Sequence, residues 1–251
     1  MVNGVYKTME STMSEPTRRE RARAATDREI RQQARTLLIN EGPEAVTLRA
    51  IARQLGITAP ALYRYYSSRE DLVRHVRMDI CADLADDLTA DLAEVPESDT
   101  VQQVLTICRG FRRWALAHPR EFSMVFATPQ GTTDDLAADP FGRIFLSVAG
   151  KVLITKQISP PPDDAVPLPM RADLEAFRAD LLSTIAHSGV AVPEDILSLG
   201  TAYMILQFWV RLYGQVALEV FGHFPMLISN TENFFEIMLA DLVADAGLNV
   251  T

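Results

Sequence analysis

Arg211 is the residue whose chemistry stands out first, because it is the single charge in the segment 196–218. A guanidinium inside an apolar helix needs a partner, since an unpaired buried charge is costly. The sequence leaves two kinds of partner open. An internal carboxylate such as Asp180 or Glu175 would make the pair structural, whereas an acidic small molecule would make Arg211 part of a ligand site.

Other residue types that catalyse reactions or hold metals are few and scattered. Cys81 and Cys108 are the only cysteines, and neither has a His at metal-ligand spacing, so we expect reduced, structural thiols. No Ser/His/Asp set, carboxylate dyad or phosphate-binding loop is evident. The sequence therefore predicts a protein that is not an enzyme and has no metal or cofactor. An all-helical enzyme remains as an alternative. The four histidines stand singly, at His75, His118, His187 and His223.

Positive and negative charges are divided unevenly along the chain. The formal net charge is -9, yet residues 1–77 hold 14 Lys/Arg against 9 Asp/Glu, and the remainder holds 10 against 24. A basic amino-terminal piece on an acidic body fits a protein whose head approaches phosphates. The arginines at 18, 19, 21 and 23 extend this charge into residues 1–25, which we expect to form a flexible basic arm.

A helix-turn-helix pattern occupies residues 48–67. Ala52 is small enough to allow two helices to cross closely, and Gly56 can take the left-handed conformation that turns the chain. Thr47 and Thr58 stand where their hydroxyls can cap the two helices. A two-helix corner of this kind presents its second helix to the major groove of DNA.

Amphipathic helices separated by Pro and Gly account for the rest, and no alternating apolar run is long enough to build a sheet. The predicted fold is all-α, with an amino-terminal three-helix helix-turn-helix domain over 26–72 and a larger helical ligand-binding and dimerisation domain over 73–251. Ser67 and Glu70 form a predicted capping box for a long helix that joins the two. The proline-rich stretch 159–169 is expected to be a stiff, exposed connector.

The segment 196–218 is apolar on nearly all sides but too polar for a membrane span, because Arg211 and several Ser, Thr and Gln interrupt it. Two such helices from each of two subunits would close a four-helix bundle, so we expect a homodimer without a membrane anchor. The residues expected at the dimer interface are Leu199, Tyr203, Leu206, Val210, Tyr213, Ala217, Phe234, Phe235 and Met238.

Residues 47–72, TLRAIARQLGITAPALYRYYSSREDL, resemble the TetR family of bacterial transcriptional regulators. The matching features are a Thr that opens the second helix, the Ala and Gly of the corner, a Leu-Tyr in the recognition helix and an Arg-Glu-Asp-Leu start to the fourth helix. Tyr65-Tyr66 stands where the family usually has His-Phe. Residues 208–224 are similar, more weakly, to the Trp-x-x-x-His-Gly motif of an actinobacterial subgroup, with Tyr213 in place of the His.

This resemblance implies roles for individual residues in binding operator DNA. Thr47 and Arg49 would contact phosphates, and Tyr63, Tyr65 and Arg69 would fix the register on the backbone. Arg64 is the strongest candidate for reading a guanine, because its forked donors match O6 and N7. The groove-facing part of the recognition helix would be lined by Thr58, Ala59, Pro60, Ala61 and Arg64.

The resemblance further implies a cytoplasmic repressor that a small-molecule effector releases from a palindromic operator in double-stranded DNA. A ligand-independent DNA-binding regulator or an activator is the alternative. The body would then hold a cavity, and the fourth helix would transmit the signal. The residues expected to contact the ligand are Phe111, Trp114, Phe122, Phe126, Phe145, Phe208, Trp209 and Arg211.

Overall fold

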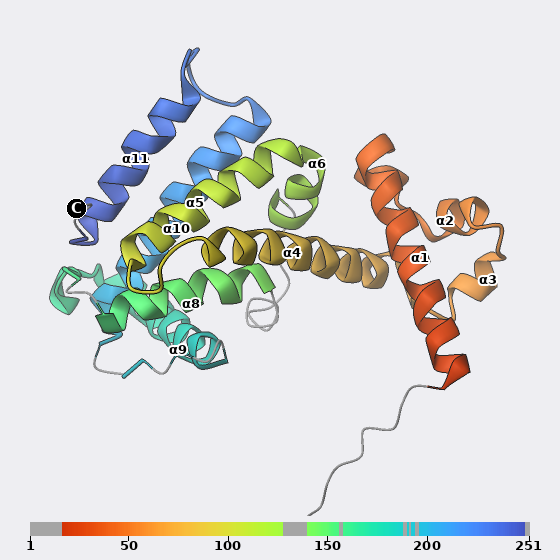
Figure 1. The fold of residues 1–251 in the computed structure, drawn as a ribbon, viewed down its shortest axis with the longest axis horizontal. Coiled ribbons are helices and arrows are strands. Elements are labelled where there is room, and N and C mark those ends of the chain that lie inside the picture. The colour runs from red at the N-terminus through yellow and green to blue at the C-terminus, as the bar shows by residue number, and fades with distance from the viewer. Residues whose placement is uncertain are drawn as a thin grey trace, which may run out of the picture. The chain divides into compact units, whose positions relative to one another are not determined.

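The computed structural model describes residues 17–127, 140–155, 158–187, 190, 192–193 and 196–248. All regular elements in these ranges are helical (Figure 1), which confirms the predicted all-α fold. The chain divides into two compact units, an amino-terminal unit of Met1–Val73 and a body of Arg74–Thr251.

The amino-terminal unit packs α1 (Arg18–Glu41) against α2 (Leu48–Gln54), which in turn contacts α3 (Ala59–Leu62). The short 3-10 turn η1 (Pro43–Ala45) joins α1 to α2 after Gly42, whose φ of 95° ends the first helix. Apolar side chains from each helix make one small core with no exposed surface; among them are Ile30, Leu38, Ile51 and Leu62.

α1 begins earlier than the sequence suggested, and the expected flexible arm over 1–25 is therefore wrong for residues 18–25. The cause is a capping box at Thr17. Its hydroxyl accepts from the Glu20 N–H at 3.3 Å, and the Glu20 carboxylate accepts from the Thr17 N–H at 2.7 Å. These bonds satisfy two of the donors that a helix start leaves open. Residues 1–16 of the expected arm lie outside the described residues.

The body is built from longer helices that pack against one another (Figure 1). α5 packs against α8 and α10, α9 packs against α8 and α10, and α11 covers α5 and α10. Short turns of 3-10 or π type join several of them. The bounds are α5 (Thr100–Ala117), α6 (Pro119–Phe122), η2 (Ser123–Ala127), α8 (Pro140–Thr155), η3 (Asp163–Ala165), η4 (Leu168–Met170), α9 (Arg171–His187), α10 (Leu199–Phe221) and α11 (Thr231–Asp245).

α4 (Arg69–Ala93) is one continuous helix that runs from the amino-terminal unit into the body. The helix carries an apolar stripe, in which Leu72, Ile80, Leu84 and Leu88 have no exposed surface. The helix is capped one residue later than expected. The Ser68 hydroxyl, rather than that of Ser67, accepts the N–H of the third helical residue, Asp71, at 3.1 Å.

The proline-rich stretch is not a simple exposed connector. Val166 is buried, and the Asp163 carboxylate accepts the Gly200 N–H at 2.8 Å, so the stretch caps the start of α10. Gly200 is required there, because a Cβ at this position would lie 1.8 Å from the Pro161 carbonyl oxygen. The prolines therefore hold the stretch against the body.

Candidate nucleic-acid interface and body cavity

The corner between α2 and α3 is a Schellman turn. The Ile57 N–H donates to the Ala52 carbonyl at 3.0 Å, and the Gly56 N–H donates to the Arg53 carbonyl at 3.3 Å. Gly56 has a φ of 66°, a conformation that favours glycine. Thr47 caps the start of α2 as predicted, with its hydroxyl accepting the Ala50 N–H at 3.2 Å. The helix-turn-helix is therefore set largely by local bonds.

Thr58 occupies the cap position of α3, but its hydroxyl accepts no capping bond, contrary to the prediction. Pro60 is the second residue of the helix and has no N–H to donate. The Ala61 N–H instead donates to the Thr58 backbone carbonyl at 2.9 Å. The hydroxyl of Thr58 is exposed and takes no part in holding the helix.

The side chains expected to touch DNA divide into exposed and half-buried groups. The exposed ones come from the start of α2 and from the recognition segment 58–64: Arg49, Thr58, Pro60, Tyr63 and Arg64. Half-buried ones are Thr47, Ala59, Ala61, Tyr65 and Arg69. The two cations and Tyr63, which is 55% exposed, thus have the accessibility that a contact with DNA requires.

Arg69 has a structural task inside the amino-terminal unit. Its Nε donates to the Val46 carbonyl and its Nη2 to the Pro43 carbonyl, each at 2.8 Å. These bonds hold the linker before α2 against the start of α4. A phosphate contact by Arg69 stays a prediction, and any such contact would have to use its remaining donors.

Tyr66, to which the sequence assigned no role, is the aromatic anchor of the recognition segment. Its ring is 2% exposed, and its hydroxyl donates to Asp27 Oδ1 on α1 at 2.5 Å. Burial and this hydrogen bond raise the pKa of Tyr66. Arg31 pairs with the same carboxylate. Tyr65, its neighbour, is half-buried and lies under the guanidinium of Arg23, 5.8 Å from the ring centroid.

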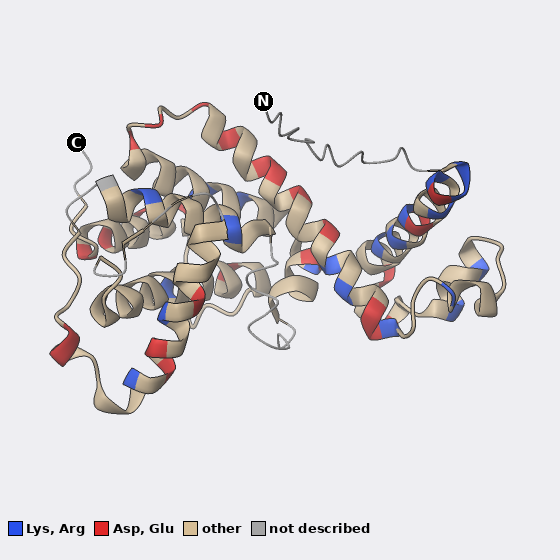
Figure 2. Ribbon diagram, turned by 90° about the horizontal axis from the view of Figure 1, so that it is seen from below, with Lys and Arg blue, Asp and Glu red and all other residues tan. Residues whose placement is uncertain are grey.

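Basic side chains recur along α1 and around α2 and α3, while acidic ones are spread over the helices of the body (Figure 2). The arginines at the start of α1 lie on a helix rather than on a flexible arm, so their positive charges belong to the folded amino-terminal unit. Such a surface favours a polyanion as its partner.

Most of the aromatic residues expected around a ligand pack against one another instead. Phe111, Phe122 and Phe126 have ring centroids 5.1–6.0 Å apart, and Phe111 and Phe122 are fully buried. Trp209 joins them at 5.7 Å from Phe111. Trp114 stacks on His118 at 5.3 Å. Phe111, Trp114 and Phe122 belong to the buried core and Phe126 and Trp209 are half-buried, and none of the five lines the body cavity described next.

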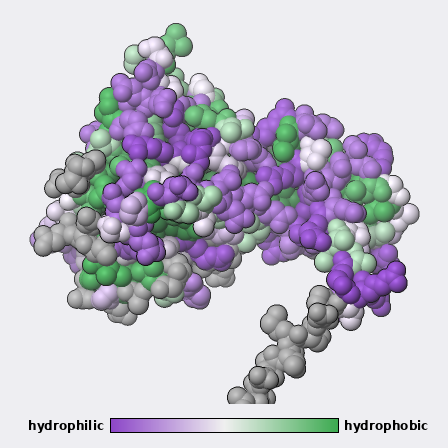
Figure 3. Space-filling model, in the orientation of Figure 1, coloured by the Kyte–Doolittle hydropathy of each residue, from purple (hydrophilic) through white to green (hydrophobic). Residues whose placement is uncertain are grey.

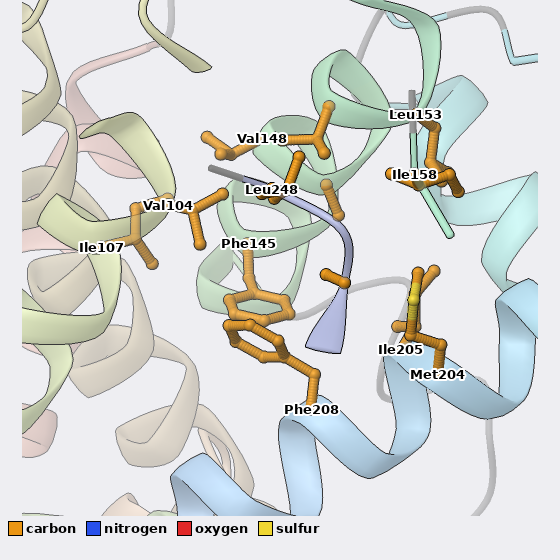
Figure 4. Close-up of a pocket in the computed structure, with 13 residues that line it drawn as sticks. Val104, Ile107, Phe145, Val148, Leu153, Ile158, Met204, Ile205, Phe208 and Leu248 are labelled. Carbon is orange, nitrogen blue, oxygen red and sulfur yellow. The ribbon is translucent and has the colours of Figure 1, made fainter. Parts of the chain in front are cut away.

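The cavity lies among α5, α8, α10 and two non-helical pieces, Ile158 and the chain after α11 (Figure 4). Its accessible volume is about 70 Å³, several times the roughly 10–15 Å³ that one water molecule needs. Phe145 and Phe208 line it as predicted, and their rings lie together in Figure 4. The complete lining is Val104, Ile107, Phe145, Val148, Ala149, Val152, Leu153, Ile158, Met204, Ile205, Phe208, Ala246 and Leu248.

Arg211 is exposed and does not line this cavity, and it pairs with neither of the expected carboxylates, Asp180 and Glu175. Its Nη1 donates to Asp245 Oδ2 at 2.5 Å, and the two side chains are 42% and 64% exposed. The helical period turns position 211 toward the end of α11. The sequence could not place α11 there, and so could not name this partner.

The residues expected at the dimer interface differ in how exposed they are. Val210 and Phe234 are 57% and 43% exposed, and Ile237, which was not expected, is 56% exposed. Phe235 is fully buried beneath Arg112 and has no surface for a partner, so its assignment to the interface is wrong. Tyr213 turns inward and donates to the Phe126 carbonyl at 2.8 Å. The other expected residues are half-buried, namely Leu199, Tyr203, Leu206, Ala217 and Met238.

Two ion pairs tie α5 to the last two helices. Arg112 makes a bidentate pair with Glu219 on α10, with N···O distances of 2.8 and 2.7 Å and side chains only 15% and 8% exposed. Burial works to raise the pKa of Glu219, but hydrogen bonds from Arg112 and Thr231 hold it below its usual value. Arg109 pairs with Glu236 on α11 in the same geometry, but at the surface.

The part of the chain that the structure describes also bears on metal binding and on membrane insertion. No group of His, Cys, Asp or Glu among the described residues could hold a metal ion. Within the same ranges, none of the helices combines the length and the apolar character needed to cross a bilayer. Both cysteines are buried there and free of disulfide bonds, and burial raises the pKa of the Cys108 thiol.

Comparison with known proteins gives matches over both units. Residues 30–76 match the family described as "Bacterial regulatory proteins, tetR family", and residues 104–242 match "Tetracyclin repressor-like, C-terminal domain". The chain is 27% identical over 219 residues to the HTH-type transcriptional regulator Rv1816 of Mycobacterium tuberculosis, covering 82% of this chain and 86% of that protein. The uncharacterized HTH-type transcriptional regulator Rv0681 of the same organism is 35% identical over 101 residues, 40% of this chain and 45% of its own length.

The solved structure of the putative regulatory protein SCO4313 superposes with a TM-score of 0.63 at 26% identity. The superposition covers 91% of this chain and 100% of the SCO4313 chain. The matches therefore include the Gly56 corner, the recognition segment and the body that holds the cavity. The chain belongs to the TetR family of bacterial transcriptional regulators, and its helix-turn-helix makes it a DNA-binding member.

Proposed function

We propose that this regulator binds a palindromic operator as a homodimer and represses transcription until a small molecule occupies the body cavity. The observation that carries the proposal is the exposed recognition segment behind the Gly56 turn, where Thr58, Tyr63 and Arg64 point into solvent. Bacterial DNA lies in the cytoplasm, so we infer that the protein acts there. The relatives are named as transcriptional regulators, which supports a role without catalysis.

Arg64 is the residue we assign to base reading. It is exposed and lies one turn beyond Ala61 in a segment whose other groove-facing side chains are small. A bidentate Arg–guanine pair discriminates by about 1–3 kcal/mol. Arg49, exposed on the first turn of α2, is assigned to a phosphate.

The experiment is a salt-matched titration of the operator found by footprinting. Arg64→Ala should weaken binding by about 1–3 kcal/mol and relax the preference at one base position, whereas Arg49→Ala should weaken all sequences equally and lower the salt slope by about one. Arg113→Ala, which removes an exposed cation from the body, is the control. Unchanged affinity of Arg64→Ala would refute the assignment, and uniform coating of DNA without a discrete palindrome would refute sequence-specific binding.

The apolar face of α10 and α11 supports the homodimer. Val210, Leu218 and Phe221 on α10 and Phe234 and Ile237 on α11 are all exposed in the single chain. Figure 3 shows hydrophobic surface at the end of the body where the turn between these two helices lies. A Cβ at Gly214 would meet nothing within 4 Å, so a partner helix could approach closely there.

Four such helices, two from each subunit, would bury this face as a bundle. Ile237→Glu should therefore give a monomer in sedimentation analysis and abolish tight operator binding, because two recognition helices must lie about 34–36 Å apart to read successive major grooves. Asp241→Glu on the same helix is the matched control. A dimer that survives Ile237→Glu would rule out this face.

The position of the cavity suggests how a bound ligand could affect the dimer interface. Its walls include three residues of α10 and two that follow α11, and none of its lining residues comes from α4. Occupancy would thus act first on the helices of the proposed dimer face. Coupling between effector and DNA is typically about 1–3 kcal/mol and reciprocal, so operator DNA should weaken ligand binding by the same factor.

A further inference from the structure

The lining of the body cavity has an unusual composition for a regulatory ligand site. All 13 lining residues are apolar, and 11 of them are aliphatic or Met or Ala side chains. Figure 4 shows Phe208 from α10 beside Phe145 from α8, and Met204 and Ile205 from α10 on the side of Leu153 and Ile158. Ligand sites ordinarily include a few polar groups that orient the ligand. None of these side chains can donate or accept a conventional hydrogen bond.

The main chain offers little in their place. The chain after α11 uses its own N–H groups: Ala246 donates to Leu242, Gly247 to Ala244 and Leu248 to Val243, at 3.2, 2.8 and 3.0 Å. The Ala246 carbonyl is also taken, because it accepts the Ser159 N–H at 3.1 Å. The other lining residues except Ile158 lie within helices, beyond their first turns, so their N–H groups bond along the helix.

The arginines of α5 and α10, two of the helices that wall the cavity, are already paired with carboxylates. On α5, Arg109, Arg112 and Arg113 pair with Glu236, Glu219 and Asp91. On α10, Arg211 pairs with Asp245. An anionic ligand in the cavity would lose its hydration without gaining any of these partners. Burying an unpaired charge in apolar surroundings is strongly unfavourable.

We infer that the effector is an uncharged, mainly aliphatic small molecule, held by burial of its hydrocarbon surface rather than by a salt bridge. The inference rests on the proposed function, because it assigns the chemistry of the ligand in that same cavity. It replaces the acidic ligand that Arg211 suggested from the sequence.

Calorimetry of the full-length protein with three matched series of probes tests the inference. The probes are hexanol, octanol and decanol, the carboxylates of the same chain lengths, and the corresponding alkylammonium ions, all at neutral pH. The alcohols should bind, with the dissociation constant falling roughly four-fold per added methylene, which corresponds to about 0.8 kcal/mol. Both ionic series should bind at least roughly ten-fold more weakly at equal chain length.

Two variants locate the binding in the cavity. Ala149→Leu fills the space with an apolar side chain and should abolish binding of decanol while leaving the melting temperature unchanged or higher. Met204→Lys places a cation in the wall and should reverse the preference, so that decanoate binds more tightly than decanol. Met226→Lys, at an exposed position in the turn after α10, is the matched control and should bind as the wild type does.

Equal or tighter binding of the wild type to the carboxylates, or no binding of the alcohols, would overturn the inference. Binding of decanol that persists in Ala149→Leu would also overturn it, and this variant decides the question even if Met204→Lys fails to fold. Different results would refute the proposed function. A wild type that ignores duplex DNA refutes the regulator, and one that binds decanol without losing operator affinity refutes release by a ligand.

Discussion

The buried pair of Arg112 and Glu219 gives the most quantitative test of how the body is held together. Glu219→Gln keeps the size of the side chain but removes the charge that faces a guanidinium only 15% exposed. Breaking a buried pair by removing one partner costs about 3–5 kcal/mol. Gln keeps one acceptor and the site is not completely dry, so we expect about 2–3 kcal/mol.

The assay is thermal unfolding followed by circular dichroism at fixed protein concentration. For a chain of this size each kcal/mol lowers the melting temperature by about 2–4 °C, so Glu219→Gln should lower it by roughly 4–12 °C. Glu236→Gln is the matched control, because it breaks an equally well-formed pair whose side chains are 42% and 38% exposed. Exposed pairs contribute only about 0–1 kcal/mol.

The pH dependence adds a second readout. The hydrogen bond from Arg112 holds the pKa of Glu219 below its unfolded value despite the opposing effect of burial, so this carboxylate stabilises the fold above the unfolded pKa and loses that effect as the pH falls through the folded pKa. The difference between wild type and Glu219→Gln should therefore shrink in acid. Equal losses for Glu219→Gln and Glu236→Gln at neutral pH would refute the argument from burial.

Three further substitutions test other parts of the structure. Gly200→Ala places a Cβ against the Pro161 carbonyl and should destabilise the body by about 1–3 kcal/mol in urea unfolding; an unchanged midpoint would show that the connector does not pack there. Gly56→Ala should lower the free energy of unfolding by about 1–2 kcal/mol, because alanine is disfavoured at a φ of 66°. A variant with wild-type stability and wild-type operator affinity would contradict the turn. Tyr66→Phe removes the hydrogen bond to Asp27 and should lower stability by about 1–2 kcal/mol. Hydrogen exchange in the amino-terminal unit measures this loss, and unaltered protection would contradict the role of Tyr66 as an anchor.

Several features that depend on near neighbours in the chain followed from the sequence, although Thr58 makes no capping bond and Ser68 rather than Ser67 caps α4. The Thr47 cap, the Gly56 turn and the apolar stripe of α4 each arise from residues a few positions apart, whose spacing fixes the bonds they can make. The resemblance over residues 47–72 rests on the same local pattern. One local signal was overlooked, the Thr17–Glu20 capping box that starts α1.

Features that depend on distant segments had to come from the tertiary structure. The sequence contains several carboxylates that could pair with Arg211, and only the packing of α11 beside α10 selects Asp245. Adjacent tyrosines differ in the same way, since contact with α1 buries Tyr66 and leaves Tyr65 half-buried. Aromatic content suggested a ligand site, but rings also pack well against one another, and the aliphatic cavity emerges only where α5, α8, α10 and the end of the chain meet. Helical period determines which residues share a face, whereas the identity of the opposing face is a property of the folded body.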